Sequence, residues 1–291
     1  MAADEADEAD ELEEEEPETE DDASPSASAL WADVRIDPIE IALPSGVGYT
    51  LRAYRPPADI AGGADRAGNL DDFDAASAAV AEQRRRARAD DDSDDSDDED
   101  AEELDDLDLE EDELEEELDE GDEEDEEDEP EEVPVFLGRG GKLYLFHSQD
   151  KLVEFVRSGA ENDLSQVDTW PELVKRIGVD DVDPSEEDTY ELDLLVENLR
   201  GGADAWDAPL IIKAGEIARD LGHALHIEPI QVALAPGSPL DDFDEALRSA
   251  ESGGIGSFFA RRKLRKVSSQ QTTLSWRTVI GKISAATDWR D

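Results

Sequence analysis

The stretch VRIDPIEIALPSGVGYTLRAYRPP, from Val34 to Pro57, decides the fold of this chain. Apolar residues nearly alternate with polar ones in its first half, PSGVG follows, and Tyr49, Leu51 and Tyr54 continue beyond it. Alternation with period two is typical of a strand with one buried face, and proline, serine and glycine are typical of turns. The pattern therefore predicts two antiparallel strands.

A second pair of strands is predicted in VPVFLGRGGKLYLFHS, from Val133 to Ser148. Two apolar runs flank RGGK, and its glycine pair suits a tight turn with positive φ angles. The same glycines with Lys142 also suggest a phosphate-binding loop. That alternative lacks the full glycine-to-lysine spacing, a following Ser or Thr and a helix downstream, so the hairpin is favoured.

The signals after these strands are mostly helical. Ser148 is a suitable cap for a helix that ends at Gly159, and Thr169 with Glu172 has the spacing of a capping box. Further helices are predicted over 209–226, 239–250 and 274–289. The segment 189–202 fits both a strand and a helix, and we favour the helix. The predicted class is α+β, with a small antiparallel sheet followed by about five to seven helices.

Two segments hold most of the negative charge. Residues 1–22 contain 14 acidic side chains and residues 90–132 contain 33, with no base in either, which leaves 36 of the 83 acids against all 26 bases. Such segments bury too little apolar surface to offset a chain entropy of about 1–2 kcal/mol per residue. We therefore predict a disordered acidic N-terminus over 1–31, a disordered acidic insertion over 58–132, and one folded domain formed by 32–57 and 133–291.

Several kinds of chemistry are not expected. The chain has no cysteine, which excludes disulfides and thiolate metal sites and fits a reducing cytoplasm. No signal peptide and no long apolar run is visible, so we expect no membrane insertion. His223 and His226 with Asp220 could face one metal ion, but a fourth ligand is missing. No activated nucleophile stands out either, so we expect a protein without enzymatic activity, cofactor or metal.

Basic residues cluster near the C-terminus. From Gly253 to Asp291 there are eight bases against two acids. Such a cluster can bind phosphate backbones with a steep salt dependence, or it can pair with the protein's own acidic segments. The candidate contact residues for nucleic acid or an acidic partner are Arg261, Arg262, Lys263, Arg265 and Lys266.

The acidic insertion also carries regularly spaced leucines. Leu104, Leu107, Leu114 and Leu118 fall on heptad a and d positions, and Glu111 occupies the intervening a position. One interpretation is a helix that forms on a basic, partly apolar partner. The other is a solvated tract whose leucines never become ordered.

The two strand pairs and the helix after them also resemble a known family. The matching residues are Pro38 to Leu43, Tyr49 to Leu51, Phe136 to Gly138, Leu143, Tyr144, Phe146, Leu152, Val153, Phe155 to Arg157 and Asn162 to Leu164. They resemble the N-terminal part of the actinobacterial SatS export chaperones, some of whose relatives are labelled primosomal proteins. The family joins its second and third strands by a short loop, so the acidic insertion is a departure from it.

The resemblance implies a cytoplasmic, non-enzymatic chaperone for exported proteins. With the composition, it predicts a chaperone-like interaction protein whose acidic segments and α+β body bind basic or export-destined proteins. The alternative is a nucleic-acid-associated factor of replication or primosome type, with a basic C-terminal helix gated by the acidic insertion.

Overall fold

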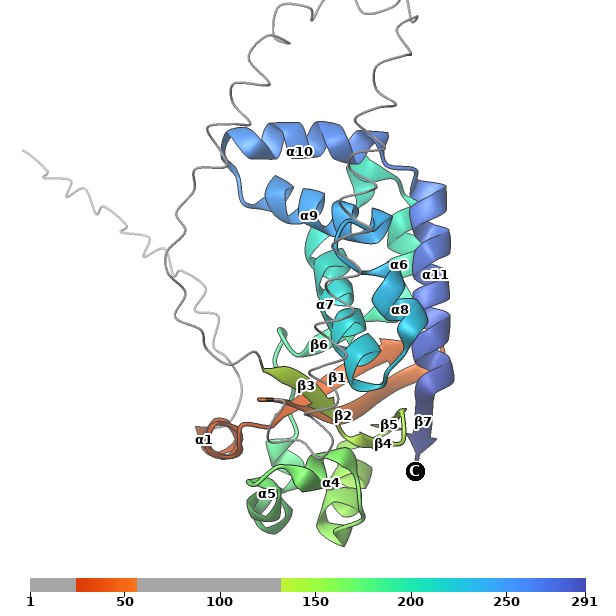
Figure 1. Ribbon diagram of the computed structural model, residues 1–291. Coiled ribbons are helices and arrows are strands. Elements are labelled where there is room, and N and C mark those ends of the chain that lie inside the picture. The colour runs from red at the N-terminus through yellow and green to blue at the C-terminus, as the bar shows by residue number, and fades with distance from the viewer. Residues whose placement is uncertain (1–24, 57–131) are drawn as a thin grey trace, which may run out of the picture.

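A mixed seven-stranded sheet lies at the centre of the computed structural model, which describes residues 25–56 and 132–291 (Figure 1). The strand order is β4-β5-β2-β1-β6, with β3 also paired to β2 and β7 paired to β5. The strands are β1 (Asp37–Leu43), β2 (Gly46–Arg55), β3 (Val133–Phe136), β4 (Gly138–Arg139), β5 (Lys142–Phe146), β6 (Thr189–Glu191) and β7 (Thr287–Arg290).

The two predicted hairpins are confirmed. Strands β1 and β2 are antiparallel, and Leu43 pairs with Gly46 across the short turn between them. Strands β4 and β5 flank Gly140 and Gly141, whose φ angles are 61° and 75°. Two consecutive positive φ angles define the primed turn that the glycine pair predicts.

The sheet is mixed rather than purely antiparallel. Strand β6 runs parallel to β1, and β7 runs parallel to β5. The ambiguous segment 189–202 contains both expected elements in succession, since β6 is followed by helix α6 (Leu192–Arg200). Strand β7 lies where the sequence predicts the end of a helix. Its pairing depends on a partner far away in the sequence, so no local signal indicates it.

One face of the sheet is covered by α1 (Pro25–Val34), α4 (Gln149–Ser158) and α5 (Trp170–Arg176), with the 3-10 turns η2 (Asp163–Gln166) and η3 (Val179–Asp181). The predicted ends of α4 are confirmed, because the Ser148 side chain accepts a hydrogen bond from the Lys151 amide and Gly159 has a φ of 67°. Tyr144 and Phe146 point from β5 to this face, whereas Leu143 and Leu145 point to the other.

Helix α1 lies partly inside the segment predicted to be disordered. Leu30 and Trp31 are 3% and 8% exposed, and the Trp31 indole donates a hydrogen bond of 2.8 Å to the Asp181 carbonyl. Val34, expected at the start of a strand, is the last residue of α1, and Arg35 with a φ of 53° separates the helix from β1. The folded part therefore begins before the predicted boundary at residue 31.

The opposite face is covered by α6, α7 (Ala208–Ala224), α8 (Glu228–Ala233), α9 (Pro239–Glu251), α10 (Gly254–Lys266) and α11 (Ser269–Ala286), with η4 (Ala203–Ala205) between α6 and α7. Ala214, Ile217, Ala218 and Leu221 of α7 follow helical spacing and are buried, at 2% exposure or less. Burying one such leucine or isoleucine completely contributes about 1.5–3 kcal/mol. The α+β class is confirmed, and the described residues contain nine α-helices, more than the five to seven expected.

Most of the acidic N-terminal segment and almost all of the acidic insertion lie outside the described residues, at positions 1–24 and 57–131. The predictions for these two segments therefore stay predictions. What the structure adds is where the insertion connects: Arg55 of β2 pairs with Val133 of β3. The chain therefore leaves and re-enters the sheet at adjacent strands.

Candidate partner-binding surface

Helix α10 lies at the end of the helical layer farthest from the sheet (Figure 1). It packs against α9, and its Ala260 and Leu264, one turn apart, are each 7% exposed. Gly253 and Gly254 precede these residues with φ angles of 78° and 79°. Glycine adopts such angles without strain, which allows the sharp change of direction between α9 and α10.

All five cations predicted as a contact site lie exposed on α10. Successive helical residues are about 100° apart, so the cations lie on both sides of the buried stripe of Ala260 and Leu264. Within residues 25–56 and 132–291, none of the five forms an ion pair. The structure therefore brings Arg261, Arg262, Lys263, Arg265 and Lys266 together as an uncompensated positive surface, which we call the α10 cationic face.

Part of this charge has a structural explanation. Lys263, Arg265 and Lys266 lie in the last turn of α10, where the helix dipole favours cations by about 0.3–1 kcal/mol each. Arg261 and Arg262 lie before that turn and gain little from the dipole. The α10 cationic face therefore has more positive charge than the end of a helix explains.

Two carboxylates of α9, Asp241 and Asp244, are engaged away from the α10 cationic face. Arg219 of α7 contacts Asp241 at 3.1 Å and Asp244 at 2.9 Å. Arg248 contacts the same Asp244 at 3.2 Å and Glu216 of α7 at 3.0 Å. These ion pairs join α9 to α7, so the two aspartates are engaged on the side of α9 that faces α7.

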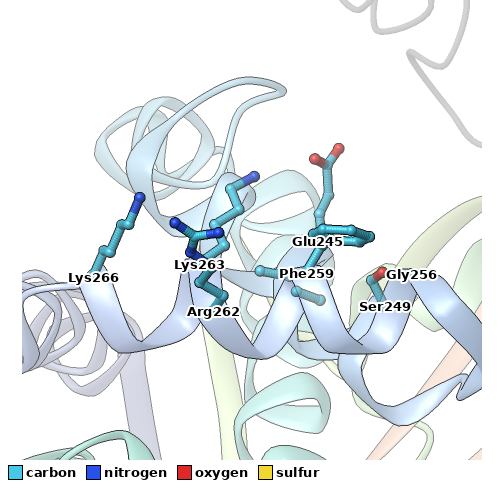
Figure 2. A pocket seen from close by; sticks show the side chains of 9 residues that line it. Glu245, Ser249, Gly256, Phe259, Arg262, Lys263 and Lys266 are labelled. Atoms are coloured by element: carbon cyan, nitrogen blue, oxygen red, sulfur yellow. The ribbon is translucent and has the colours of Figure 1, made fainter. Parts of the chain in front are cut away.

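A groove of about 450 Å³ separates α9 from α10, and Figure 2 shows its side chains. Phe259, Ala246 and Ala260 provide apolar surface, and Ser249 and Glu245 provide polar atoms. Arg262, Lys263 and Lys266 extend on the same side of α10 as Glu245 (Figure 2). The groove thus combines an apolar surface with a mainly cationic rim.

Apolar surface is also exposed beside this groove. Phe258 is 66% exposed and packs edge-to-face on Phe259 with the ring centres 5.7 Å apart. Leu274 of α11, which lines a separate groove with Arg200 and Arg277, is 64% exposed. A second groove, of about 430 Å³, lies where α9, α10 and α11 meet, and its apolar lining includes Leu240, Phe243 and Val267. Exposed apolar surface between polar residues is typical of protein-binding sites.

A second cluster of charged residues was not anticipated from the sequence. Arg52 of β2 donates hydrogen bonds to the Tyr190 hydroxyl at 2.8 Å and to Asp188 at 3.1 Å, and lies 3.6 Å from Asp220. The Tyr54 hydroxyl donates to Asp220 at 2.5 Å. Burial raises the pKa of Asp220, and burial with the adjacent carboxylate raises the pKa of Tyr54 well above its ordinary value.

This cluster joins the sheet to the helical layer. Arg52 and Tyr54 are two residues apart on β2, so they point to the same face. That spacing is the only signal in the sequence, because the partners lie beyond the insertion, near β6 and in α7. The five grooves with the best-defined linings among the described residues do not include Arg52 or Tyr54. We therefore assign the cluster a structural role.

Leu104, Leu107, Leu114 and Leu118 lie outside the described residues. In the described part of the chain, no group of three or more His, Asp or Glu side chains is arranged to hold a metal ion. No helix there is long and apolar enough to cross a membrane.

The comparisons with known proteins point to one family. The family model of the SatS C-terminal domain matches residues 129–284. A crystal structure of a SatS C-terminal domain in complex with bromine is similar to this chain with a TM-score of 0.53 and 18% sequence identity, over 89% of this chain and 96% of that one. At this identity the likeness shows a shared fold. No curated protein matches the chain.

The match corrects one expectation. The resemblance in the sequence points to the N-terminal part of SatS, whereas the matching family model describes the C-terminal domain. The motifs from Phe136 to Leu164 lie inside the matched residues, and those from Pro38 to Leu51 lie before them. Most of the motif residues lie in the strands of the sheet and in α4. The resemblance therefore reflects the shared fold and does not identify the N-terminal part of the family's sequence.

Proposed function

Because the chain belongs to the family of SatS C-terminal domains, we propose that it is a chaperone-like, non-enzymatic protein that binds non-native or export-destined polypeptides. The observation that carries this proposal is the apolar surface along α10. Phe258 is exposed, and the two grooves beside α10 have apolar linings. Non-native chains expose apolar side chains, and such surface binds them.

The acidic segments have a separate role in this proposal. A polyanion of 33 acids within 43 residues attracts basic polypeptides and keeps a complex soluble. Salt screens this attraction over a Debye length of about 8 Å at physiological ionic strength. We propose that the α+β body holds apolar parts of a client and that the acidic segments hold its basic parts.

A measurement of client aggregation tests the α10 surface. The full chain should suppress light scattering by a chemically unfolded, basic, aggregation-prone protein diluted from denaturant. Phe258→Ser should weaken this protection, because it removes exposed apolar area without altering the core. Val232→Ser, at a position that is 55% exposed on α8, is the matched control and should protect like the parent. Equal protection by the parent and Phe258→Ser would exclude α10 as the client surface.

A nucleic-acid-associated function is the second candidate. It is favoured by the α10 cationic face, whose five side chains have no ion-pair partner among the described residues. In this alternative the acidic insertion gates the face, so a chain without residues 58–131 should shift DNA or RNA with a strong salt dependence. If neither that chain nor the parent shifts nucleic acid at low salt, the alternative is excluded.

A further inference from the structure

We infer that the α10 cationic face binds the chain's own acidic, leucine-bearing segment, residues 104–118. This inference rests on the proposed function, because it names what occupies α10 beside the client grooves. Three features support it: complementary charge, complementary apolar surface, and the length of chain that joins the two.

The charges of the two surfaces are complementary. The α10 cationic face has five exposed cations, and Asp241 and Asp244 of the neighbouring α9 are engaged by Arg219. The insertion has 33 acids and no base over residues 90–132. A contact at 4 Å between opposite charges contributes about 1 kcal/mol in water and more at a partly shielded surface. Several such contacts together favour this pairing.

The apolar surfaces are complementary as well. In a helix bound to α10, Leu104, Leu107, Leu114 and Leu118 would lie on one side, as the heptad spacing requires. Phe258 offers apolar surface on the same helix that presents the cations. A purely electrostatic partner would leave Phe258 in water, whereas the leucines of this segment contact it as long as no client is bound.

The chain is long enough to make this contact. The first residues of α7 lie beside α10, since Ala208 shares a groove with Arg261, and the residues after α7 lie beside β3, since His226 shares a groove with Val133. Helix α7 has 17 residues and is therefore about 25 Å long. The chain from Leu118 to Val133 spans at most about 50 Å. The tether covers the distance, and tethering of this kind corresponds to an effective concentration of about a millimolar.

Nucleic acid is a weaker candidate for the same face. The formal net charge of the chain is −57, so a polyphosphate is repelled at long range. It also competes with a segment of the same chain that is already present at high effective concentration. We therefore assign the α10 cationic face to residues 104–118.

Carbodiimide cross-linking of the full chain tests this assignment, because it joins lysines to carboxylates in direct contact. The chain has only seven lysines, so a map by mass spectrometry is simple to interpret. Lys263 and Lys266 should link to acids within residues 104–118 several-fold more often than the exposed Lys175 and Lys282 do. The excess should disappear at about 1 M salt, where the Debye length is about 3 Å. Equal yields from all four lysines would overturn the inference.

Charge reversal that keeps the lysines provides the control. Arg261→Glu with Arg262→Glu should reduce the links from Lys263 and Lys266 several-fold. Lys175→Glu with Arg277→Glu changes the charge by the same amount, at exposed positions on α5 and α11. This pair should leave the number of links from Lys263 and Lys266 unchanged. Circular dichroism shows whether each variant is folded. The inference is overturned if both pairs of substitutions have the same effect.

Two further measurements identify the occupant. In a mixture of isotopically labelled and unlabelled protein, the links should stay within one copy; links between copies would assign the face to a second chain. A shift of single-stranded DNA by the parent at low salt, abolished by Arg261→Glu with Arg262→Glu, would assign it to nucleic acid. Protection of a client from aggregation is measured separately. If the chain protects the client but Lys263 and Lys266 do not cross-link to residues 104–118, only this inference is contradicted. If the cross-links form but the client is not protected, only the proposed function is contradicted.

Discussion

The main chain of Arg55 pairs with that of Val133 across the adjacent antiparallel strands β2 and β3, although the whole acidic insertion separates the two residues in sequence. The insertion is therefore the loop of a hairpin whose ends are held together by the sheet. Because the entropy of closing a loop grows with the logarithm of its length, the fold tolerates this long connection.

Replacing residues 58–131 by a linker of about ten Gly and Ser residues should leave the fold intact. Each halving of the loop length lowers the cost of closure by about 0.6 kcal/mol, so the shortened chain should gain about 2 kcal/mol of stability. Thermal unfolding followed by circular dichroism at physiological salt measures the gain. Loss of a cooperative transition would show that the insertion contributes to the folded core.

Gly222 of α7 should tolerate no side chain. A Cβ at this position would lie 2.9 Å from Cγ2 of Ile230 in α8. Gly222→Ala should therefore lower the free energy of unfolding by about 1–3 kcal/mol through overpacking. Gly281 of α11 is the matched control, since a Cβ added there would meet no atom within 4 Å. Gly281→Ala should stabilise the protein by about 0.5–1 kcal/mol. Denaturant titration compares the two, and equal effects would contradict the packing.

Asp220 should make stability depend on pH in a defined direction. Its pKa is raised above the unfolded value of 3.8, mainly by burial, while Tyr54 and Arg52 act in the opposite direction. Between the two pKa values the native state binds more protons than the unfolded state, so the contribution of Asp220 to stability falls as the pH rises.

Asp220→Asn removes this titration. Its unfolding free energy relative to the parent should therefore increase as the pH rises above the unfolded pKa of 3.8. Other raised groups, such as Asp37, are present in both proteins and cancel in the difference. Denaturant titrations at several pH values measure it, and a difference that stays constant with pH would contradict the assignment.

Trp31 should contribute strongly to the stability of the core between α1 and the sheet. It is 8% exposed and donates a hydrogen bond to the Asp181 carbonyl. Trp31→Ala should lower the free energy of unfolding by about 3–5 kcal/mol, as for other large-to-small changes in a core. Asp33→Ala, on the same helix, removes only an exposed ion pair with Arg176 and should change stability far less than Trp31→Ala does. Similar losses in both variants would show that Trp31 is not part of the core.

Features with a local cause were predictable from the sequence. The hairpin turn at Gly140 and Gly141 depends on adjacent residues, as do the ends of α4 at Ser148 and Gly159. The buried residues of α7 also follow helical spacing within one continuous segment. The five cations of α10 were identified as candidates because they are neighbours in sequence.

Features that join distant segments were not predictable in this way. Strand β6 pairs in parallel with β1, and β7 pairs in parallel with β5. The residues of these two short strands do not indicate either pairing. The partners of Arg52 lie in segments beyond the insertion, and the grooves beside α10 depend on how α9 and α11 pack against it. The sequence indicates which residues carry the charge of the candidate site, but its shape depends on tertiary packing.

The parallel pairing of β7 with β5 has a consequence for synthesis on the ribosome. Leu145 of β5 pairs with Trp289 of β7, so the sheet is complete only after every helix of the opposite layer has been made. Contacts this distant in sequence form late and slow folding. During translation the edge of β5 therefore lacks its partner strand, and the nascent chain has an open sheet edge of the kind that promotes aggregation.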